Sequence, residues 1–485
     1  MAEVPGVADR AAERRYEPVI GLEIHVQLRT RTKMFCGCEL SFGDEPNTHT
    51  CQICLGHPGT LPVVNAEAVH FALMIAAALE CEIAPRSIFH RKNYFYPDLP
   101  KGYQISQYDI PLARSGRLGD VRIHRVHLEE DAAKLVHAGA SGRIHGAETS
   151  VVDFNRGGTP LVEIVSEPDV RSAAEAGDWG RLLRATLKRL GVSDVNMEEG
   201  SLRVDANVSI RPAGEATLGT KTELKNMNSF RFLERAIEAE IERQEAIVRD
   251  GGTVEQKTLH FDPQTGNLSP LRSKEYEHDY RYFPEPDLVP LVPTEDMLER
   301  ARAALPELPA ARIKRFERDF GLPGETAQLL AFRSELGDYF EEAVASDSAD
   351  ARTLANWVRN ELVQRIGEAD PAESKVSPAA LAQLVSMVEG KTVSQSAAKE
   401  VLDVLASEGG DPKAIVEARG LALAGGDELD SIVQRAIDAD PDAVEQIKAG
   451  NQKAIGALMG AIMRETKGRA DGKEVQRLIR ERIGA

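Results

Sequence analysis

Four cysteines lie close together near the N-terminal end of the chain. They form a C-x-C pair and, twelve residues later, a C-x-x-C pair: Cys36, Cys38, Cys51 and Cys54. Two such pairs can complete a tetrahedral thiolate shell around Zn²⁺, and a closed shell leaves no position for a substrate. The spacing predicts a structural zinc site within residues 36–54, with metal-free reduced thiols or a redox pair as alternatives. His49 and His57 are near enough in sequence to replace a ligand, although a four-cysteine shell needs neither.

Carboxylates and one histidine form a second group with chemical potential. Glu23 and His25 share one face of an alternating segment, three acidic residues occupy 129–131, and Glu163 interrupts an apolar run. A carboxylate in an apolar run is costly unless it is paired or binds a metal. Hard oxygen ligands with one imidazole suit Mg²⁺ or Mn²⁺, which can bind nucleotide phosphates. Spacing alone does not bring these residues together, so separate surface carboxylates are the other interpretation.

Residues 91–106 combine cations, aromatic side chains and turn-forming residues in an order too irregular for a helix or a strand. Lys92 in such a loop can contact a phosphate, and the aromatic rings can stack against a base. A tyrosine-rich structural loop fits the composition equally well. The sequence has no G-x-x-x-x-G-K-[ST] motif, because Val385 stands where the first glycine would precede Gly390. Any use of ATP therefore proceeds without a P-loop.

The last stretch, 451–485, differs in charge from the rest of the chain. It holds eight Lys and Arg against four Asp and Glu, a local charge of +4, whereas the whole chain carries −18. A net negative chain repels a phosphate backbone, so nucleic-acid binding would need a local basic surface. The candidates in this stretch are Lys467, Arg469, Lys473 and Arg477. A solvated helix face with intrahelical ion pairs accounts for the same charges.

Strands must position the acidic group. Apolar and polar residues alternate over 19–28 and again over 202–210, which predicts two strands that each have one polar face. Asp205 and Asn207 share the polar face of the second strand.

Helices are predicted at 66–79, 172–190 and 232–248. Ser172 and Glu175 have the spacing of a capping box, and Gly191 suits the position after the last helical turn. A further helix is predicted to begin at Ser377-Pro378 and to end at Gly390.

Composition suggests several domains. A chain of 485 residues is too long for one ordinary domain, and 42% hydrophobic content can form several cores. We expect an α+β fold with a flexible N-terminus at 1–15, a strand-rich domain at 16–293, an all-α domain at 294–400 and a small helical tail domain at 401–485. No apolar run reaches the roughly 20 residues of a membrane span, and no secretory signal is present. We therefore expect a cytoplasmic protein that binds neither membrane nor DNA.

The sequence resembles the B subunits of the glutamine-dependent aspartyl/glutamyl-tRNA amidotransferases. The segment from Val152 to Ile164, which reads VDFNRGGTPLVEI, matches the family signature almost residue for residue. The other matching segments are 19–26, 91–106, 127–132, 197–207, 221–230 and 279–290. The resemblance extends from about residue 16 to the C-terminus. It implies a cradle-shaped catalytic domain, a helical domain and a tail similar to the YqeY proteins.

The resemblance also implies roles for individual residues. By motif position, Glu23, His25, Glu130 and Glu163 would hold a catalytic Mg²⁺. Asp205 and Asn207 would help to bind the nucleotide, Asp205 would alternatively hold a second metal, and Lys92 would contact the substrates. The four cysteines match the zinc-bearing branch of the family. The basic residues of the tail would contact tRNA.

The implied reaction is a phosphorylation followed by an amidation. ATP would phosphorylate the side-chain carboxylate of Glu mischarged on tRNA(Gln), or of Asp on tRNA(Asn), and ammonia would displace the phosphate. The ammonia would come from the amidase (glutaminase) partner, the A subunit, in a heterotrimer that also contains a small C subunit. Two alternatives are an archaeal-type relative that acts only on Glu-tRNA(Gln) and a non-catalytic, zinc-stabilised scaffold that holds tRNA.

Overall fold

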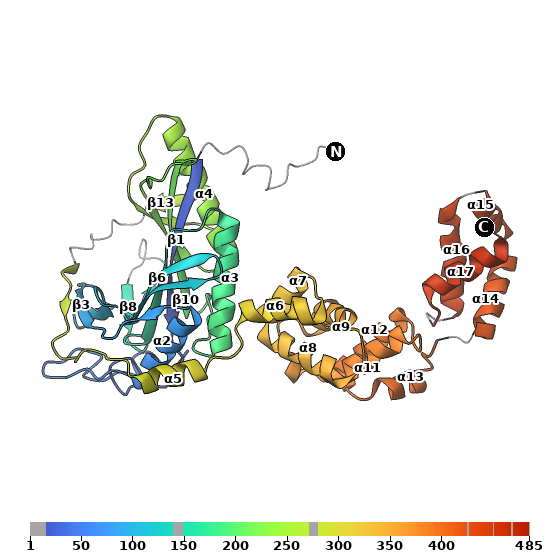
Figure 1. The fold of residues 1–485 in the computed structure, drawn as a ribbon, viewed down its shortest axis with the longest axis horizontal. Helices are drawn as coiled ribbons and strands as arrows, with labels where there is room; N and C mark the ends of the chain where they lie inside the picture. Colours follow the sequence, from blue (N-terminus) through green and yellow to red (C-terminus); the bar gives the residue numbers. More distant parts are fainter. Residues whose placement is uncertain are drawn as a thin grey trace. The chain divides into compact units, whose positions relative to one another are not determined.

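The computed structural model describes residues 16–138, 149–270, 280–423, 426–449, 451–466 and 469–484. The predicted flexible segment 1–15 and the candidate Lys467 lie outside these residues. The chain divides into two compact units, with the boundary between Leu308 and Pro309 (Figure 1). The described strands lie in the first unit, while the described part of the second unit is helical.

A nine-stranded sheet is the framework of the first unit. Its strand order is β13-β12-β11-β10-β1-β9-β6-β5-β2, and neighbours are antiparallel except β11 and β12. The strands are β1 (Tyr16–Gln27), β2 (Glu82–Ile83), β5 (Ala113–Leu118), β6 (Val121–Glu130), β9 (Pro160–Ser166), β10 (Leu202–Pro212), β11 (Thr222–Met227), β12 (Thr258–Phe261) and β13 (Leu268–Pro270). Both strands predicted from alternation are confirmed as β1 and β10, which lie side by side.

The alternation gives the sheet two different faces. Ile20, Leu22, Ile24 and Val26 of β1 are buried in the hydrophobic core, while the side chains of Glu23, His25 and Gln27 alternate with them. Helices α2 (Ala66–Ala78), α3 (Ala173–Leu190) and α4 (Phe230–Arg249) contribute to that core, and α3 and α4 run beside the sheet in Figure 1. The opposite face of the sheet is therefore left to carry polar side chains.

The predicted helix ends are mostly confirmed. Ser172 accepts a hydrogen bond from Glu175 N at 3.1 Å, and Gly191 takes the left-handed conformation with φ of 70°. The carboxylate of Glu175, however, accepts from Arg171 N rather than from the Ser172 amide, so the capping box is only half formed. Ser377 caps helix α11 (Pro378–Glu389), as predicted.

Two small sheets accompany the large one. One contains β14 (Phe283–Pro284), β3 (Phe89–Asn93) and β4 (Tyr103–Gln107), and the other contains β7 (Lys134–Ala138) and β8 (Thr149–Asp153). The expectation that 91–106 is irregular throughout is wrong, because its two ends pair as strands β3 and β4. The many polar residues of this segment obscure the two strands in the sequence. The strands also form no separate hydrophobic core, since β4 lies against β6 of the large sheet.

Helices form two hydrophobic cores beyond α5 (Glu295–Ala303). One core includes buried residues from Phe316 to Leu421, and the other from Leu429 to Ile483. The helices are α6 (Pro309–Phe320), α7 (Gly324–Phe332), α8 (Ser334–Ser346), α9 (Ala351–Asn356), a π-helical segment (Trp357–Leu362), α10 (Val363–Ile366), α11, α12 (Gln395–Glu408), α13 (Pro412–Arg419), α14 (Gly426–Ala439), α15 (Pro441–Lys448), α16 (Ile455–Glu465) and α17 (Gly472–Ile483). The α+β class is confirmed. Among the described residues, no helix has the length and apolar character needed to cross a membrane.

Candidate functional site

The polar face of the large sheet gathers the predicted acidic residues. Pairing of β1 with β9 sets His25 opposite Glu163, and pairing of β1 with β10 sets Glu23 opposite Asp205. On the other edge of β9, β6 sets His127 opposite Glu163. Paired residues in neighbouring strands project to the same side, so these five side chains share one face.

His25 stands at the centre of the cluster. Its Nε2 lies 3.4 Å from Glu163 Oε2, 3.6 Å from Glu23 Oε1 and 3.9 Å from Glu129 Oε1. His127 flanks Glu163 on the other side, with Nε2 3.5 Å from Glu163 Oε2. Ligand atoms fall within 4.8 Å of one another in two overlapping triads, Glu23–His25–Asp205 and His25–Glu129–Glu163. Carboxylate oxygens with one imidazole are a donor set that suits Mg²⁺ or Mn²⁺.

Burial and charge divide the carboxylates of the cluster into two kinds. Burial, reinforced by the negative charge of Glu163, raises the pKa of Glu23. Burial also favours the neutral form of Glu163, but His127, His25 and Arg125 outweigh it and hold the pKa of Glu163 well below its usual range. Arg125 donates from Nη2 to Glu163 Oε1 at 2.9 Å. Burial opposes the charged form of His25, yet its hydrogen bond with Glu163 raises the pKa of the imidazole.

Glu129, and not Glu130, joins this cluster. Both residues belong to β6, so their side chains point to opposite faces. Glu130 Oε1 instead accepts from Ile105 N at 2.9 Å and pairs with Lys101. The geometry therefore corrects the expectation that Glu130 shares a site with Glu23, His25 and Glu163.

Lys92 reaches the cluster from β3. Its Nζ lies 4.8 Å from the centroid of the Tyr280 ring. Burial opposes its charge, but Tyr282, Glu129 and Glu163 outweigh burial and raise the pKa of Lys92. The neighbouring carboxylates therefore favour the charged form of Lys92, and an ammonium group can bind a phosphate.

Asp205 is held by a cation of its own. Lys225 of β11 pairs with Asp205 and lies 3.3 Å from Glu223 Oε1. Burial opposes the charge of Lys225, but these two carboxylates raise its pKa. Asn207 lies opposite Gly21 of β1 and Glu223 of β11, two residues farther along β10.

Several residues of the site, among them Arg203 and Gln27, were not predicted from the sequence. Arg203, opposite His25 on β10, places Nη2 2.9 Å from Asp131 Oδ2, and Gln27 donates to the same oxygen at 2.7 Å. Asp131 is buried, but Arg203 and Arg156 lower its pKa. Arg203 Nε is buried without a hydrogen-bond partner among the described residues. Arg125, His127 and Glu129 are spaced two residues apart, which indicates that they share one face of a strand. The sequence therefore contained a signal for these three residues.

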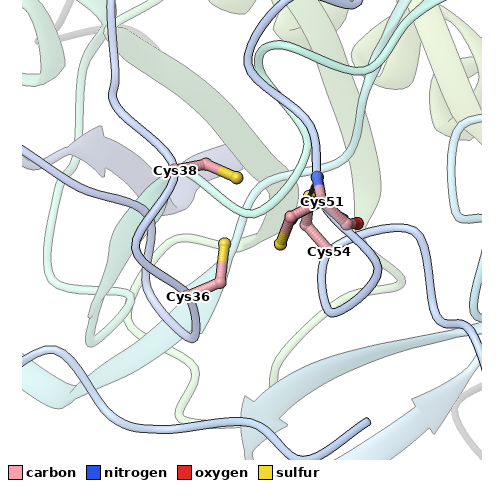
Figure 2. Close-up of side chains that lie close together, drawn as sticks. All are labelled: Cys36, Cys38, Cys51 and Cys54. Carbon is pink, nitrogen blue, oxygen red and sulfur yellow. Dashed lines mark hydrogen bonds between the residues drawn. The ribbon is translucent and has the colours of Figure 1, made fainter.

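The four predicted zinc ligands converge (Figure 2). All four sulfur atoms lie within 4.8 Å of one another, and Cys51 Sγ lies 3.9 Å from Cys54 Sγ. A hydrogen bond from Cys36 and the charge of Lys33 outweigh burial and lower the pKa of Cys54 to about 4, so this thiol is readily ionised. His49 bonds to Asp44 at 2.7 Å instead of joining the group. A closed four-sulfur set fits Zn²⁺ in a structural role.

Two of the predicted tRNA contacts of the tail, Arg469 and Arg477, form ion pairs. Arg477 of α17 contacts Glu474 at 2.7 Å and Glu481 at 2.6 Å, both in its own helix. Arg469 lies 3.1 Å from Glu428 of α14. The backbone amide of Lys473 bonds to the capping residue Asp471. Arg477 thus has the arrangement expected of a solvated helix face, and the tRNA contact stays a prediction.

Comparison with known proteins agrees with these elements. A family model described as the GatB/GatE catalytic domain matches residues 18–299, and one described as the GatB domain matches 338–483. A protein of Carboxydothermus hydrogenoformans, named as the B subunit of an aspartyl/glutamyl-tRNA(Asn/Gln) amidotransferase, is 48% identical over 97% of this chain and 99% of its own length. The chain belongs to the family of amidotransferase B subunits. Proteins with the same name in Moorella thermoacetica and Frankia casuarinae are each 49% identical, over 96% and 99% of this chain and 100% and 98% of their own lengths.

Membership in this family makes the chain part of a multisubunit glutamine-dependent ligase that acts on tRNA. It also sets aside the archaeal-type alternative, because these relatives are of the aspartyl/glutamyl type and match the chain from end to end.

Proposed function

We propose that this chain phosphorylates the side-chain carboxylate of Glu mischarged on tRNA(Gln), or of Asp on tRNA(Asn), with ATP and then catalyses its amidation by ammonia. The observation that carries the proposal is the position of His25 within 3.4 Å of Glu163 and 3.6 Å of Glu23 on the polar sheet face. Family membership supplies the reaction class. The sheet supplies a donor set suited to the cation that phosphoryl transfer needs.

Glu23, His25, Glu129 and Glu163 are the residues that would hold Mg²⁺, and Asp205 with Asn207 would bind a second metal or the nucleotide. Bound Mg²⁺ would neutralise the charge of the phosphates during transfer. Glu130 was expected in the first set from the resemblance, but its pairing with Lys101 supports Glu129 in its place.

The remaining charged side chains would bind and orient the substrates. Lys92 keeps its proton beside the cluster and would contact phosphate oxygens. Arg125 and His127 keep Glu163 ionised, which preserves its capacity to bind a cation.

The other assignments are also proposals. Zn²⁺ would be held by the four cysteines, ammonia would come from the amidase partner (the A subunit) in a heterotrimer with the C subunit, and the tail with Lys473 and Arg477 would contact tRNA. The boundary between the helical domain and the tail domain would lie between Leu421, where one hydrophobic core ends, and Leu429, where the next begins, instead of at residues 400–401. We place the protein in the cytoplasm.

A non-catalytic scaffold is the alternative function. Burial of carboxylates and cations costs free energy of folding. A scaffold without catalytic function would have no reason to retain such residues. Glu129, Glu163 and His127 have side chains that are at most 8% exposed, and they lie together on the sheet face. This arrangement favours catalysis.

The proposed function is tested by assembling the chain with its amidase partner and supplying each mischarged tRNA with ATP and glutamine. We expect Gln-tRNA(Gln), Asn-tRNA(Asn) or both, only when ATP is present. The same complex incubated without ATP is the control. Amidation at the same rate in that control, or amidation of neither tRNA with ATP, would overturn the proposal.

A further inference from the structure

Lys33 is a buried lysine without an acidic partner. Its residue exposure is 1%, which makes it one of the largest fully buried side chains of the chain. Among the described residues it forms no ion pair with a carboxylate. Its Nζ lies 3.8 Å from Cys54 Sγ and donates to Phe154 O at 2.9 Å. A buried ammonium requires a nearby negative charge, and a carbonyl oxygen supplies only a partial one.

The carboxylate that lines the same pocket is already paired with another lysine. Glu130 lines the same pocket as Lys33, Cys36 and Cys54. Its Oε1, however, pairs with Lys101 and accepts from a backbone amide of β4. The sulfur of Cys54 is the group that Lys33 Nζ contacts, and the four sulfurs carry negative charge as thiolates when they bind a metal.

We propose that Lys33 is the counter-cation of the four-cysteine metal site and a positioning residue for its ligands. Zn²⁺ with four thiolates has a formal charge of about −2, which one ammonium at the sulfur of Cys54 would partly neutralise. The inference rests on the proposed zinc site. It identifies a charged residue that is not itself a ligand but on which retention of the metal depends.

The same side chain joins the metal site to the strand that carries Glu163. The carbonyl that accepts from Lys33 belongs to Phe154, and Met34 N donates to Gly158 O at 2.8 Å. Asn47, within the cysteine segment, accepts from Phe154 N at 2.7 Å. Strand β9 begins at Pro160, directly after this loop. Lys33 therefore connects the thiolates to the loop that leads to the active-site face.

Zinc affinity of the full-length chain tests the proposal, measured by competition with a chromogenic chelator. Lys33→Met removes the charge and the donor, whereas Lys33→Gln removes the charge but keeps an N–H donor. We expect both variants to bind zinc about 10- to 100-fold more weakly than the wild type. Lys257→Met is the matched control, because Lys257 is half exposed and pairs with Glu255 far from the thiols in sequence.

Cobalt substitution gives a second readout that loss of packing alone would not move. Removal of a positive charge beside a thiolate raises the energy of its sulfur electrons, so the sulfur-to-Co²⁺ charge-transfer band should shift to longer wavelength in the Lys33 variants only. If Lys33→Met does not fold, Lys33→Gln decides the question. Wild-type zinc affinity and an unshifted band in Lys33→Gln would overturn the role of Lys33 alone. Absence of stoichiometric zinc from the wild-type chain would overturn the zinc site as well.

Discussion

At the scale of residues, a few side chains on one sheet face determine what the site can bind. His25 contacts carboxylates from three strands, and Glu163 is flanked by two histidines and Arg125. The sequence predicted Glu23 and His25, because they share the polar face of an alternating segment, and Glu163, because it interrupts an apolar run. The sequence did not distinguish Glu129 from Glu130, since both come at the end of the same strand-like segment. The register of β6 against β9 decides which of the two faces His25.

Glu129 and Glu130 form a natural pair of test and control. We expect Glu129→Gln to weaken Mn²⁺ binding by at least about tenfold, because a metal site loses affinity when a ligand or its support is removed. Glu130→Gln should change Mn²⁺ affinity much less, since Glu130 faces Lys101. Titration with Mn²⁺ followed by electron paramagnetic resonance measures both values. The reverse order of effects would show that the metal lies on the other face of β6.

Cation binding should also depend on pH in a definite direction. Glu163 raises the pKa of His25 above the usual value of about 6.5. A protonated imidazole cannot bind a metal, so Mg²⁺ or Mn²⁺ affinity should be weak below about pH 6.5 and rise as the pH passes through the raised pKa. The same Mn²⁺ titration at a series of pH values checks this. An affinity that is constant from about pH 6 to about pH 9 would argue that His25 is not a ligand.

At the scale of elements, close helix packing supports the sheet that carries the site. Helices α3 and α4 cover the apolar face, and two glycines of α3 face α4. A Cβ at Gly180 would lie 2.5 Å from Cε1 of the packed Phe230 ring, while a Cβ at Gly177 would lie 2.8 Å from Cγ of the Glu234 side chain and closer still to its carboxylate. The sequence predicted the extent of α3 from its cap residues and apolar stripe. It contained no signal for these two contacts, because they depend on where α4 crosses.

The two glycines allow a matched test within one helix. We expect Gly180→Ala to lower the free energy of unfolding by about 1 to 3 kcal/mol, since the ring of Phe230 has to move. Gly177→Ala should lower the free energy of unfolding by less than Gly180→Ala does, because the Glu234 side chain can rotate away and gives up only a partly exposed ion pair with Arg181, while alanine favours the helix. Chemical denaturation measures both. Equal effects would mean that the helices do not approach at Gly180 as described.

At the scale of the whole molecule, the proposed tRNA contact brings an acidic chain against an anionic partner. The switch from mixed strands and helices to helices alone was readable from composition. The ion pair between Arg469 and Glu428 was not, because Arg469 precedes α17 and meets α14 only in the folded tail. Any phosphate contact by Arg477 must compete with Glu474 and Glu481.

Removal of the tail tests its proposed role. The helical core extends to Leu421, so truncation after Leu423 spares it, whereas truncation near residue 410 would remove the buried Val416. We expect the shorter chain, in complex with its partners, to show a higher KM for mischarged tRNA while glutamine hydrolysis continues. In the full chain, Lys473→Glu should reduce the salt dependence of tRNA binding. An unchanged KM after truncation would identify the tail surface as an ordinary solvated helix face.

The central claim is that the sheet face around His25 and Glu163 performs ATP-dependent phosphorylation of the aminoacyl side chain. The most direct measurement is the ATP-dependent formation of the side-chain hydroxamate from hydroxylamine and mischarged tRNA without an ammonia source, in which hydroxylamine displaces phosphate. The hydroxamate formed without ATP, by cleavage of the aminoacyl ester, is subtracted. The wild-type complex and a Glu167→Gln control, altered at a partly exposed glutamate just after β9, should form the hydroxamate. Glu163→Gln should form it at least about 100-fold more slowly, because charge stabilisation of the phosphates is lost. Trapping by Glu163→Gln at the wild-type rate would contradict the account.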